Sequence, residues 1–148
     1  MSSSTLAVPE KGTSMTVKKM TPILFAQEIE PSVAFWVDRL GFEKTAEVPE
    51  GDKLGFAMLQ KGGVELMYQS FASAAKDVKD APVAELARKG PAFLFVEVDD
   101  LEATIAATKG APVILPKRAT FYGSTEIGIQ DPAGHVVTFA QFGAPANA

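Results

Sequence analysis

The chain has 148 residues, of which 47% are hydrophobic and 22% charged, a composition typical of one globular domain or of two small modules sharing a core. Its formal net charge is -4, its pI is near 5.0, and its lysines and arginines do not cluster, so we expect no nucleic acid partner. The chain has no cysteine and one histidine, His135. Disulfides, thiolate chemistry and a multi-histidine metal site within one chain are therefore excluded.

The sequence contains no segment suited to a membrane. No apolar run approaches the roughly 20 residues that cross a bilayer, and the N-terminal residues lack the hydrophobic centre of a secretion signal. We therefore expect a cytoplasmic protein without a membrane partner. Residues 1–19 are rich in Ser, Thr and Lys without apolar periodicity and are expected to form a flexible tail, with a second tail at 143–148.

The first half of the chain predicts a strand, a helix and three further strands. They are a strand at 21–26, a helix from Glu30 that Gly41 ends, and strands at 42–48, 55–60 and 64–69. Pro31 suits the first helical turn because that position needs no backbone N–H donor. A glycine suits the left-handed conformation that ends many helices. The stretches PEGDK and KGG predict turns between the strands.

The same order of elements returns in the second half, after a connector. Residues 70–90 carry helix formers and predict one or two short helices. They are followed by a strand at 93–98, a helix that Asp99 or Asp100 caps and Gly110 ends, and strands at 111–116, 125–130 and 135–142. The turn DPAG joins the last two strands.

The two halves are related as a repeat. EIEPSVAFWVDRLG aligns with DDLEATIAATKG, and GGVELM with GHVVTF, at a displacement of about 70 to 73 residues. We therefore predict an α+β fold of two tandem βαβββ modules, at 20–69 and 91–142, within a single domain at 20–142. Each sheet would bury one face under its helix, and the other, concave face would be open to a ligand.

These features resemble the vicinal oxygen chelate superfamily, which includes glyoxalase I, extradiol dioxygenases, fosfomycin-modifying enzymes and bleomycin-resistance proteins. The resemblance rests on the duplicated module, on SVAFWVDRLGFE after the first strand and on DPAGHVVTFAQF near the end. It spans about Met20 to Phe142 and implies a glyoxalase/bleomycin-resistance-like fold with a concave mixed sheet. One fold hosts several activities, so the resemblance alone does not name one.

The resemblance also indicates where a metal would bind. In metal-dependent members each module supplies one ligand from its first strand and one from its last. By position these ligands fall on Thr21 and Glu65 in the first module and on Phe93 and Thr138 in the second. Divalent cations need three or four protein donors, usually carboxylate and imidazole, and only Glu65 is of that type. We therefore expect no metal and no other cofactor.

Strand alternation predicts which side chains line the concave faces. The expected ligand-binding residues on the strands are Thr21, Glu65, Met67, Phe93, Phe95 and Thr138, and Ala140 is expected on the same face as Thr138. Three roles stay open for Glu65. It is an internal carboxylate bonded by Thr21 or Thr138, an acceptor for a cationic or hydroxylated ligand group, or a general base whose pKa the apolar wall raises.

Two residues outside those strands are further candidates. Tyr122, in ATFYGSTE, is expected at the rim of the ligand site or packed on its own loop. Arg118 lies nearby and either fixes an anionic group of the ligand or only aids solubility. Trp36 is in register with other apolar helix residues and is expected in the core, and a structural role is expected for His135.

Within the superfamily, the sequence is most similar to the metal-free bleomycin-resistance proteins, which hold a drug in clefts between two chains. By this resemblance we expect a homodimer whose clefts sequester a small organic ligand, either an antibiotic or another apolar or aromatic molecule. The connector at 70–90 would form part of the cleft rim or of the dimer contact. The alternatives are a lyase, isomerase or dioxygenase-type enzyme of the same superfamily, and a protein-interaction role.

Overall fold

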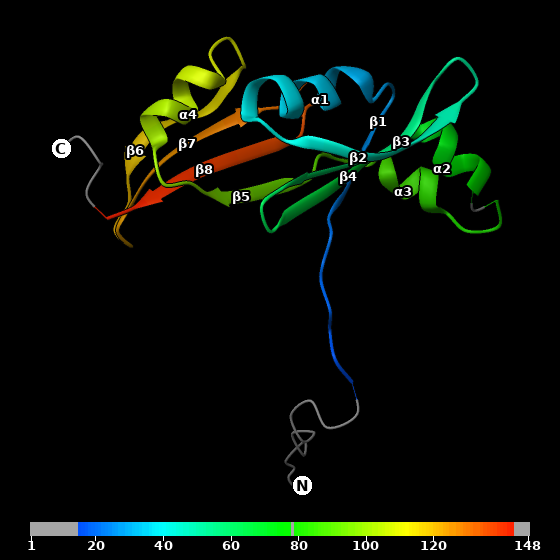
Figure 1. Cartoon of the computed structure of the whole chain (residues 1–148), viewed down its shortest axis with the longest axis horizontal. Helices are drawn as coiled ribbons and strands as arrows, with labels where there is room; N and C mark the ends of the chain where they lie inside the picture. The colour runs from blue at the N-terminus through cyan, green and yellow to red at the C-terminus, as the bar shows by residue number, and fades with distance from the viewer. Residues whose placement is uncertain (1–14, 78, 144–148) are drawn as a thin grey trace, which may run out of the picture.

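The structure is a computed structural model that describes residues 15–77 and 79–143 (Figure 1). Residues 1–14 and 144–148, most of the two expected tails, lie outside the described residues. Residues 15–20 are exposed, adopt neither helix nor strand, and run away from the body of the molecule (Figure 1).

The predicted α+β fold of two βαβββ modules is confirmed, because the order β-α-β-β-β occurs twice. The first module consists of β1 (Ile23–Ala26), α1 (Glu30–Ala34), the π-helix η1 (Phe35–Arg39), β2 (Glu43–Glu50), β3 (Lys53–Lys61) and β4 (Val64–Ser70). The connector holds α2 (Phe71–Asp77) and α3 (Val83–Ala87). The second module consists of β5 (Phe93–Glu97), α4 (Leu101–Ala107), β6 (Val113–Ala119), β7 (Ser124–Gln130) and β8 (Val136–Phe142).

The ends of several elements follow from local chemistry. Asp100 caps α4, since its carboxylate accepts the Ala103 N–H at 3.1 Å, and Gly110 has the expected left-handed φ of 96°. β1 begins later than predicted, at Ile23, although the Pro22 carbonyl accepts the backbone N–H of β4 residue Met67 at 2.9 Å.

β6 extends further than the predicted strand at 111–116. The strand reaches Ala119 because Arg118 and Ala119 continue the antiparallel pairing with β7. The pairing has irregularities on either side of Leu115. The apolar run at 111–116 therefore predicts too early an end for this strand. Its last residues are more polar and are held in the strand by pairing with β7.

Each module forms one four-stranded mixed sheet. The strand orders are β1-β4-β3-β2 and β5-β8-β7-β6, and the pairs β1–β4 and β5–β8 are parallel. Helix α1 contacts β3, and α4 contacts β7 and β8. The two sheets follow one another along the length of the molecule, with α1 and α4 on the same side (Figure 1). The opposite faces of both sheets are therefore free of these helices.

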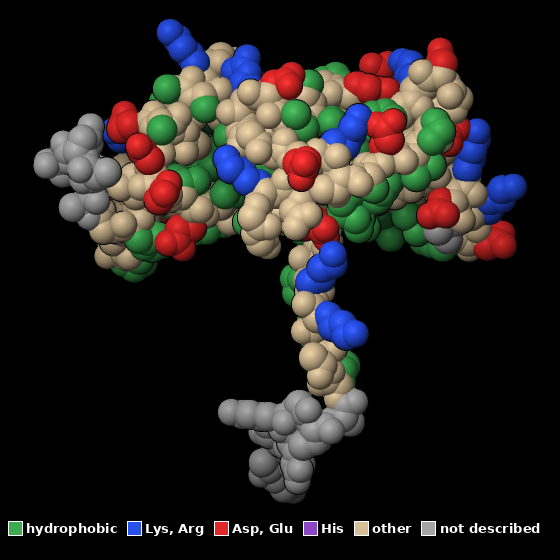
Figure 2. All heavy atoms as spheres, in the orientation of Figure 1, with side chains coloured by type: hydrophobic (Ala, Val, Ile, Leu, Met, Phe, Trp, Pro, Cys, Tyr) green, Lys and Arg blue, Asp and Glu red, His purple; other side chains and the backbone are tan. Residues whose placement is uncertain are grey.

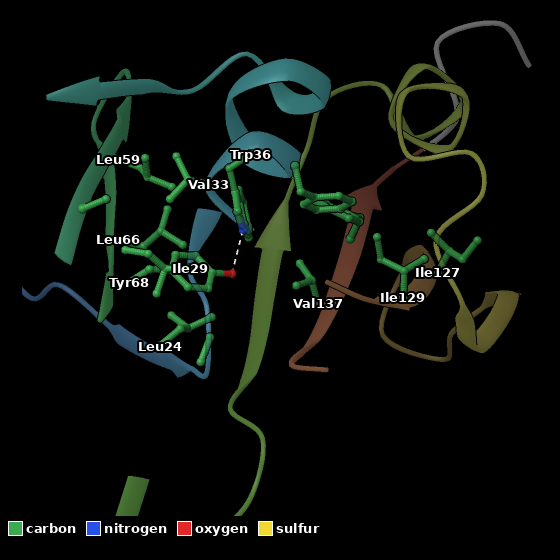
Figure 3. Close-up of a cluster of buried hydrophobic side chains, with 14 of the residues drawn as sticks. Leu24, Ile29, Val33, Trp36, Leu59, Leu66, Tyr68, Ile127, Ile129 and Val137 are labelled. Carbon is green, nitrogen blue, oxygen red and sulfur yellow. Dashed lines mark hydrogen bonds between the residues drawn. The ribbon is translucent and has the colours of Figure 1, made fainter. Parts of the chain in front are cut away.

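One hydrophobic cluster joins the two modules. It includes Leu24, Leu59 and Leu66 from the first sheet and Ile127, Ile129, Val137 and Phe139 from the second. Trp36 lies between these groups, pointing from the α1–η1 helix toward the sheets (Figure 3). It is 2% exposed, which confirms its expected place in the core.

A buried polar network crosses the boundary between the modules. The Trp36 Nε1–H donates to the Tyr68 hydroxyl at 2.8 Å (Figure 3), and that hydroxyl donates to the Asp131 carboxylate. Asp131 is 3% exposed and also accepts the backbone N–H of His135 at 2.7 Å. Burial raises the pKa of Tyr68 above its usual value of 10.0, and the Asp131 carboxylate raises it further. The hydroxyl therefore keeps its proton as a donor.

The ring of His135 makes a second link between the modules. Its Nδ1 accepts the Ala92 N–H at 2.8 Å, so this nitrogen carries no hydrogen. Its Nε2 lies 2.8 Å from the carbonyl oxygen of Phe25 in β1, and a carbonyl can only accept. The ring is therefore neutral with its hydrogen on Nε2, and its role is structural, as expected.

On the face seen in Figure 2, acidic and basic side chains are interspersed over the body. No helix of the described residues combines the length and the apolar character needed to span a bilayer.

Removing the Tyr68 hydroxyl should test the network between the modules. Tyr68→Phe leaves the buried Asp131 carboxylate without one of its donors, at an expected cost of about 1–3 kcal/mol in the free energy of unfolding measured with urea. Asp131→Asn should also destabilise the fold. The double variant should lose less than the sum of the two single losses, because both remove the same contact. Strictly additive losses would show that the contact contributes nothing.

Candidate functional site

The first open face is the side of the first sheet turned away from α1. Its strand positions are Ile23, Phe25, Phe56, Met58, Gln60, Glu65, Met67 and Gln69, which pair across the strands in register. The alternating residues Leu24, Leu66 and Tyr68 are at most 2% exposed on the helix side. The predicted alternation is therefore confirmed for this sheet.

Glu65 on this face is held by two neighbours. The Thr21 hydroxyl donates to its Oε1 at 2.8 Å, and the Lys19 ammonium lies 2.8 Å from the same oxygen. Lys19 belongs to the segment 1–19 that the sequence predicts to be a flexible tail, and its side chain is 68% exposed. Thr21 is the bonding partner expected from the sequence, whereas Thr138 lies on the other sheet.

These contacts change the electrostatics expected for Glu65. The hydrogen bond from Lys19, the hydrogen bond from Thr21 and the Lys19 charge lower the pKa of Glu65 below its usual value of 4.5, although burial opposes them. The sequence-based hypothesis of a general base with a raised pKa is therefore wrong in its direction. Both contacts are made to Oε1, so a cationic ligand group that approached this oxygen would compete with Lys19.

The connector supplies a wall beside the first open face. A hollow of about 400 Å³ lies between β1 and α3, lined by Ile23, Phe25, Val83, Leu86, Ala87 and the segment 90–92 with His135. Leu86 is 58% exposed. The connector therefore lines one side of this hollow.

The second open face is the corresponding side of the second sheet. Strand pairing places on it, in adjacent rows, Phe93, Phe95 and Glu97 of β5, Val136, Thr138, Ala140 and Phe142 of β8, Ser124, Glu126 and Gly128 of β7, and Arg118 of β6. Phe93 and Phe95 are 74% and 56% exposed. Phe95, rather than Phe93, lies directly opposite Thr138.

Ala140 lies on the same face as Thr138, as expected, but this part of the face is covered. Ala140 is buried and pairs with Glu126, which is 1% exposed. The loop between β6 and β7 returns over these residues, since the Tyr122 hydroxyl donates to Glu126 Oε2 at 2.5 Å. Tyr122 is 45% exposed and also lies 6.4 Å from Phe142, ring centroid to ring centroid. It therefore packs on Phe121 of its own loop and on Phe142, and a place at the rim of a ligand site stays a prediction.

Glu126 is a buried carboxylate that the sequence did not identify. Besides Tyr122, the Ser124 hydroxyl donates to it at 2.8 Å, and an Arg118 nitrogen lies 3.5 Å from its Oε1. Burial raises the pKa of Glu126, but the two hydroxyl hydrogen bonds and the Arg118 charge outweigh it, so the pKa lies below the usual 4.5. The carboxylate is therefore ionised and internally satisfied at neutral pH.

The residues at the family's metal-ligand positions do not fit a divalent cation. Thr21 and Glu65 are hydrogen-bonded to each other, but the corresponding positions of the second module hold a phenyl ring and a threonine. Within residues 15–77 and 79–143, no three His, Cys, Asp or Glu side chains are grouped as a metal would require. The two pairs also lie on different sheets of the chain (Figure 1).

Comparison with protein families gives one match. A family model described as the Glyoxalase/Bleomycin resistance protein/Dioxygenase superfamily matches residues 17–139. Comparison with curated protein sequences gives no match.

Solved structures with the same fold are numerous. TioX from Micromonospora sp. ML1 is similar with a TM-score of 0.68 and 19% identity, over 84% of this chain and 98% of its own. Lactoylglutathione lyase from Agrobacterium tumefaciens has a TM-score of 0.65 and 19% identity, over 86% and 95%. A glyoxalase-related enzyme from Fulvimarina pelagi has a TM-score of 0.63 and 22% identity, over 84% and 88%. At these identities the likeness shows the fold.

The contribution of Glu126 to stability should depend on pH. Its pKa is lower in the folded state, so its stabilising effect is complete above the unfolded value near 4.5 and is lost as the pH falls through the lowered folded value. The stability advantage of the wild type over Glu126→Gln should therefore shrink as the pH falls below about 4.5. Urea unfolding at a series of pH values measures this difference in the free energy of unfolding.

Glu102→Gln is the control for this experiment. Glu102 pairs with Lys117 at the surface, where both side chains are half exposed, and such pairs contribute little. The difference between wild type and this variant should stay small at every pH. A Glu126→Gln difference that did not change with pH would contradict the assignment.

Proposed function

The chain belongs to the Glyoxalase/Bleomycin resistance protein/Dioxygenase superfamily, and from this premise we propose that it is a small-molecule-binding protein that works without a metal. Its ligand is apolar or aromatic and is sequestered in a cleft, as a drug is by a resistance protein. Its ligand-binding residues are those of the two open faces, Thr21, Glu65, Met67, Phe93, Phe95, Arg118, Tyr122 and Thr138.

The exposure of aromatic rings on and beside the second open face carries this proposal. Phe93, Phe95 and Phe142 on its strands, and Phe121 and Tyr122 in the β6–β7 loop, are all at least 43% exposed. Soluble proteins rarely expose contiguous apolar patches of this kind unless the patch binds a ligand or a partner. Rings also offer large contact areas at low conformational cost.

A second copy of the chain supplies the missing wall of the cleft. Each open face is the exposed side of a sheet, and a ligand pocket usually buries most of its ligand. We propose a homodimer in which the first open face of one protomer meets the second open face of its partner. The hollow beside α3 then extends the cleft along its edge.

The donor chemistry supports binding rather than metal-dependent catalysis. A metal held at the family positions would need imidazole or carboxylate where this chain has Phe93, Thr21 and Thr138. This argument applies equally to a site shared by two protomers, because the same positions would be used. The carboxylate that remains, Glu65, is paired with Lys19.

A neutral aromatic dye should bind the dimer through the exposed rings. Light scattering on a sizing column should give a mass of twice the chain's 15.7 kDa. N-phenyl-1-naphthylamine should gain fluorescence with the wild type, and Phe95→Ala should weaken its binding about tenfold. Val64→Ala is the matched control, since Val64 is 54% exposed on the helix side of the other sheet. A monomer, or equal effects of the two variants, would contradict the proposal.

The metal-dependent enzyme alternative is tested by elemental analysis. Protein purified without chelators should contain far less than one divalent metal per chain, and added Zn²⁺ or Ni²⁺ should not raise the thermal midpoint, since binding to the folded state would do so. A metal retained at about one per chain, and lost in Glu65→Gln, would favour the enzyme instead.

A further inference from the structure

The cluster around Glu126 is the part of the cleft that the proposed function leaves unexplained. A carboxylate that is 1% exposed is costly to bury unless its partners are well placed. Here it has two hydroxyl donors and one guanidinium, from three positions in the segment 118–124. The Glu126 carboxylate has all these hydrogen-bond partners within the chain, so we consider its effect on the orientation of the side chains that bond to it.

Arg118 is the oriented side chain that reaches the cleft. It pairs directly with Glu126 across β6 and β7, so both side chains are on the second open face. Its guanidinium is 3.5 Å from a single carboxylate oxygen, a long one-point contact, and its side chain is 52% exposed. A guanidinium has five N–H donors in a planar fork. Most of that fork is therefore directed away from Glu126 and toward solvent.

Aromatic rings lie beside the Glu126 cluster. Tyr122, which shares the Glu126 carboxylate with Arg118, lies 5.1 Å from the Phe121 ring and 6.4 Å from the Phe142 ring. Phe142 in turn lies 6.4 Å from Phe95. A row of rings thus leads from the edge strand β5 to Tyr122, whose hydroxyl bonds the same carboxylate as Arg118. A flat aromatic molecule placed on this row would bring a substituent within reach of Arg118.

The charge that is open to a ligand beside these rings is that of Arg118. Its partner Glu126 is 1% exposed, whereas the Arg118 side chain is 52% exposed, and Glu65 lies on the other sheet, paired with Lys19. Glu97 is the remaining carboxylate of the second open face, and it lies on β5 at the opposite edge from β6. Three strand spacings, about 14 Å, separate these positions. Arg118 therefore presents a positive fork that no acid of this face outside the cluster approaches.

We propose that the ligand of this cleft is an aromatic anion, and that Arg118, oriented by Glu126, binds its carboxylate, sulfonate or phosphate group. The rings of Phe95, Tyr122 and Phe142 hold the aromatic body. This inference rests on the proposed binding function and adds the chemical class of the ligand. Guanidinium is suited to the role because its fork matches a planar anion with two parallel hydrogen bonds.

Two dyes that share an aromatic body provide the test. 8-Anilinonaphthalene-1-sulfonate carries a sulfonate, and N-phenyl-1-naphthylamine is the same ring system without it. In fluorescence titrations Arg118→Gln should weaken the sulfonate dye about tenfold, as expected for a lost charge-assisted hydrogen bond, and change the neutral dye less than about twofold.

The neighbouring residue provides a matched control. Lys117 is 51% exposed, close to the 52% of Arg118, but it pairs with Glu102 on the helix side of the sheet. Lys117→Gln removes the same charge and should leave both dyes unchanged. Because Arg118→Gln leaves Glu126 buried without its cation, the double variant Arg118→Gln/Glu126→Gln is a second test that removes both charges. It should show the same selective loss.

The outcomes separate this inference from the proposed function. If Arg118→Gln weakens both dyes equally, or Lys117→Gln weakens the sulfonate dye as much as Arg118→Gln does, Arg118 is not an anion site. The cleft would then still bind aromatic molecules. If the wild type binds neither dye, both the anion site and the binding function are wrong.

Discussion

The packing of the two modules against each other depends on the hydrogen bonds that the buried Asp131 carboxylate accepts. An ionised group out of water costs several kcal/mol unless it is paired and hydrogen-bonded. Asp131 accepts from the Tyr68 hydroxyl of the first module and from the backbone N–H groups of Ala133 and His135 in its own turn. Since these donors come from both sides of the boundary, satisfying the carboxylate joins β4 to the turn between β7 and β8. The neutral His135 ring adds a second link, to β1.

That junction gives the two sheets a common orientation. With α1 and α4 on one side, both open faces look to the other side of an elongated molecule (Figure 1). Each face contains a carboxylate that is held by donors of its own module, Glu65 by Lys19 and Thr21, and Glu126 by Arg118 and two hydroxyls. Glu65 and Glu126 thus have donors within their own modules, whereas the aromatic rings and the outer part of Arg118 remain exposed.

The fold could be predicted from the sequence because its signals are local. Alternation in VELMYQS separates Leu66 and Tyr68 from Glu65 and Met67, and glycines end the helices where a left-handed residue is needed. The site was less predictable. TEIGIQ predicts a strand, but nothing in it indicates that the loop bearing Tyr122 returns to bury Glu126. Lys19 follows a polar segment without periodicity, and only the folded chain places it beside Glu65.

The sequence by itself determined the two βαβββ modules and the alternation of their strands, because these depend on residue type and on spacing along the chain. It also has Thr21, Phe93 and Thr138 at positions where the family resemblance implies metal ligands. The tertiary structure decided which charges are paired and which remain exposed, namely the pairing of Glu65 with Lys19, the burial of Glu126, and the exposure of Arg118 on the second open face. These features depend on distances between segments that local pattern does not encode, since a carboxylate's partners are set by what packs against it.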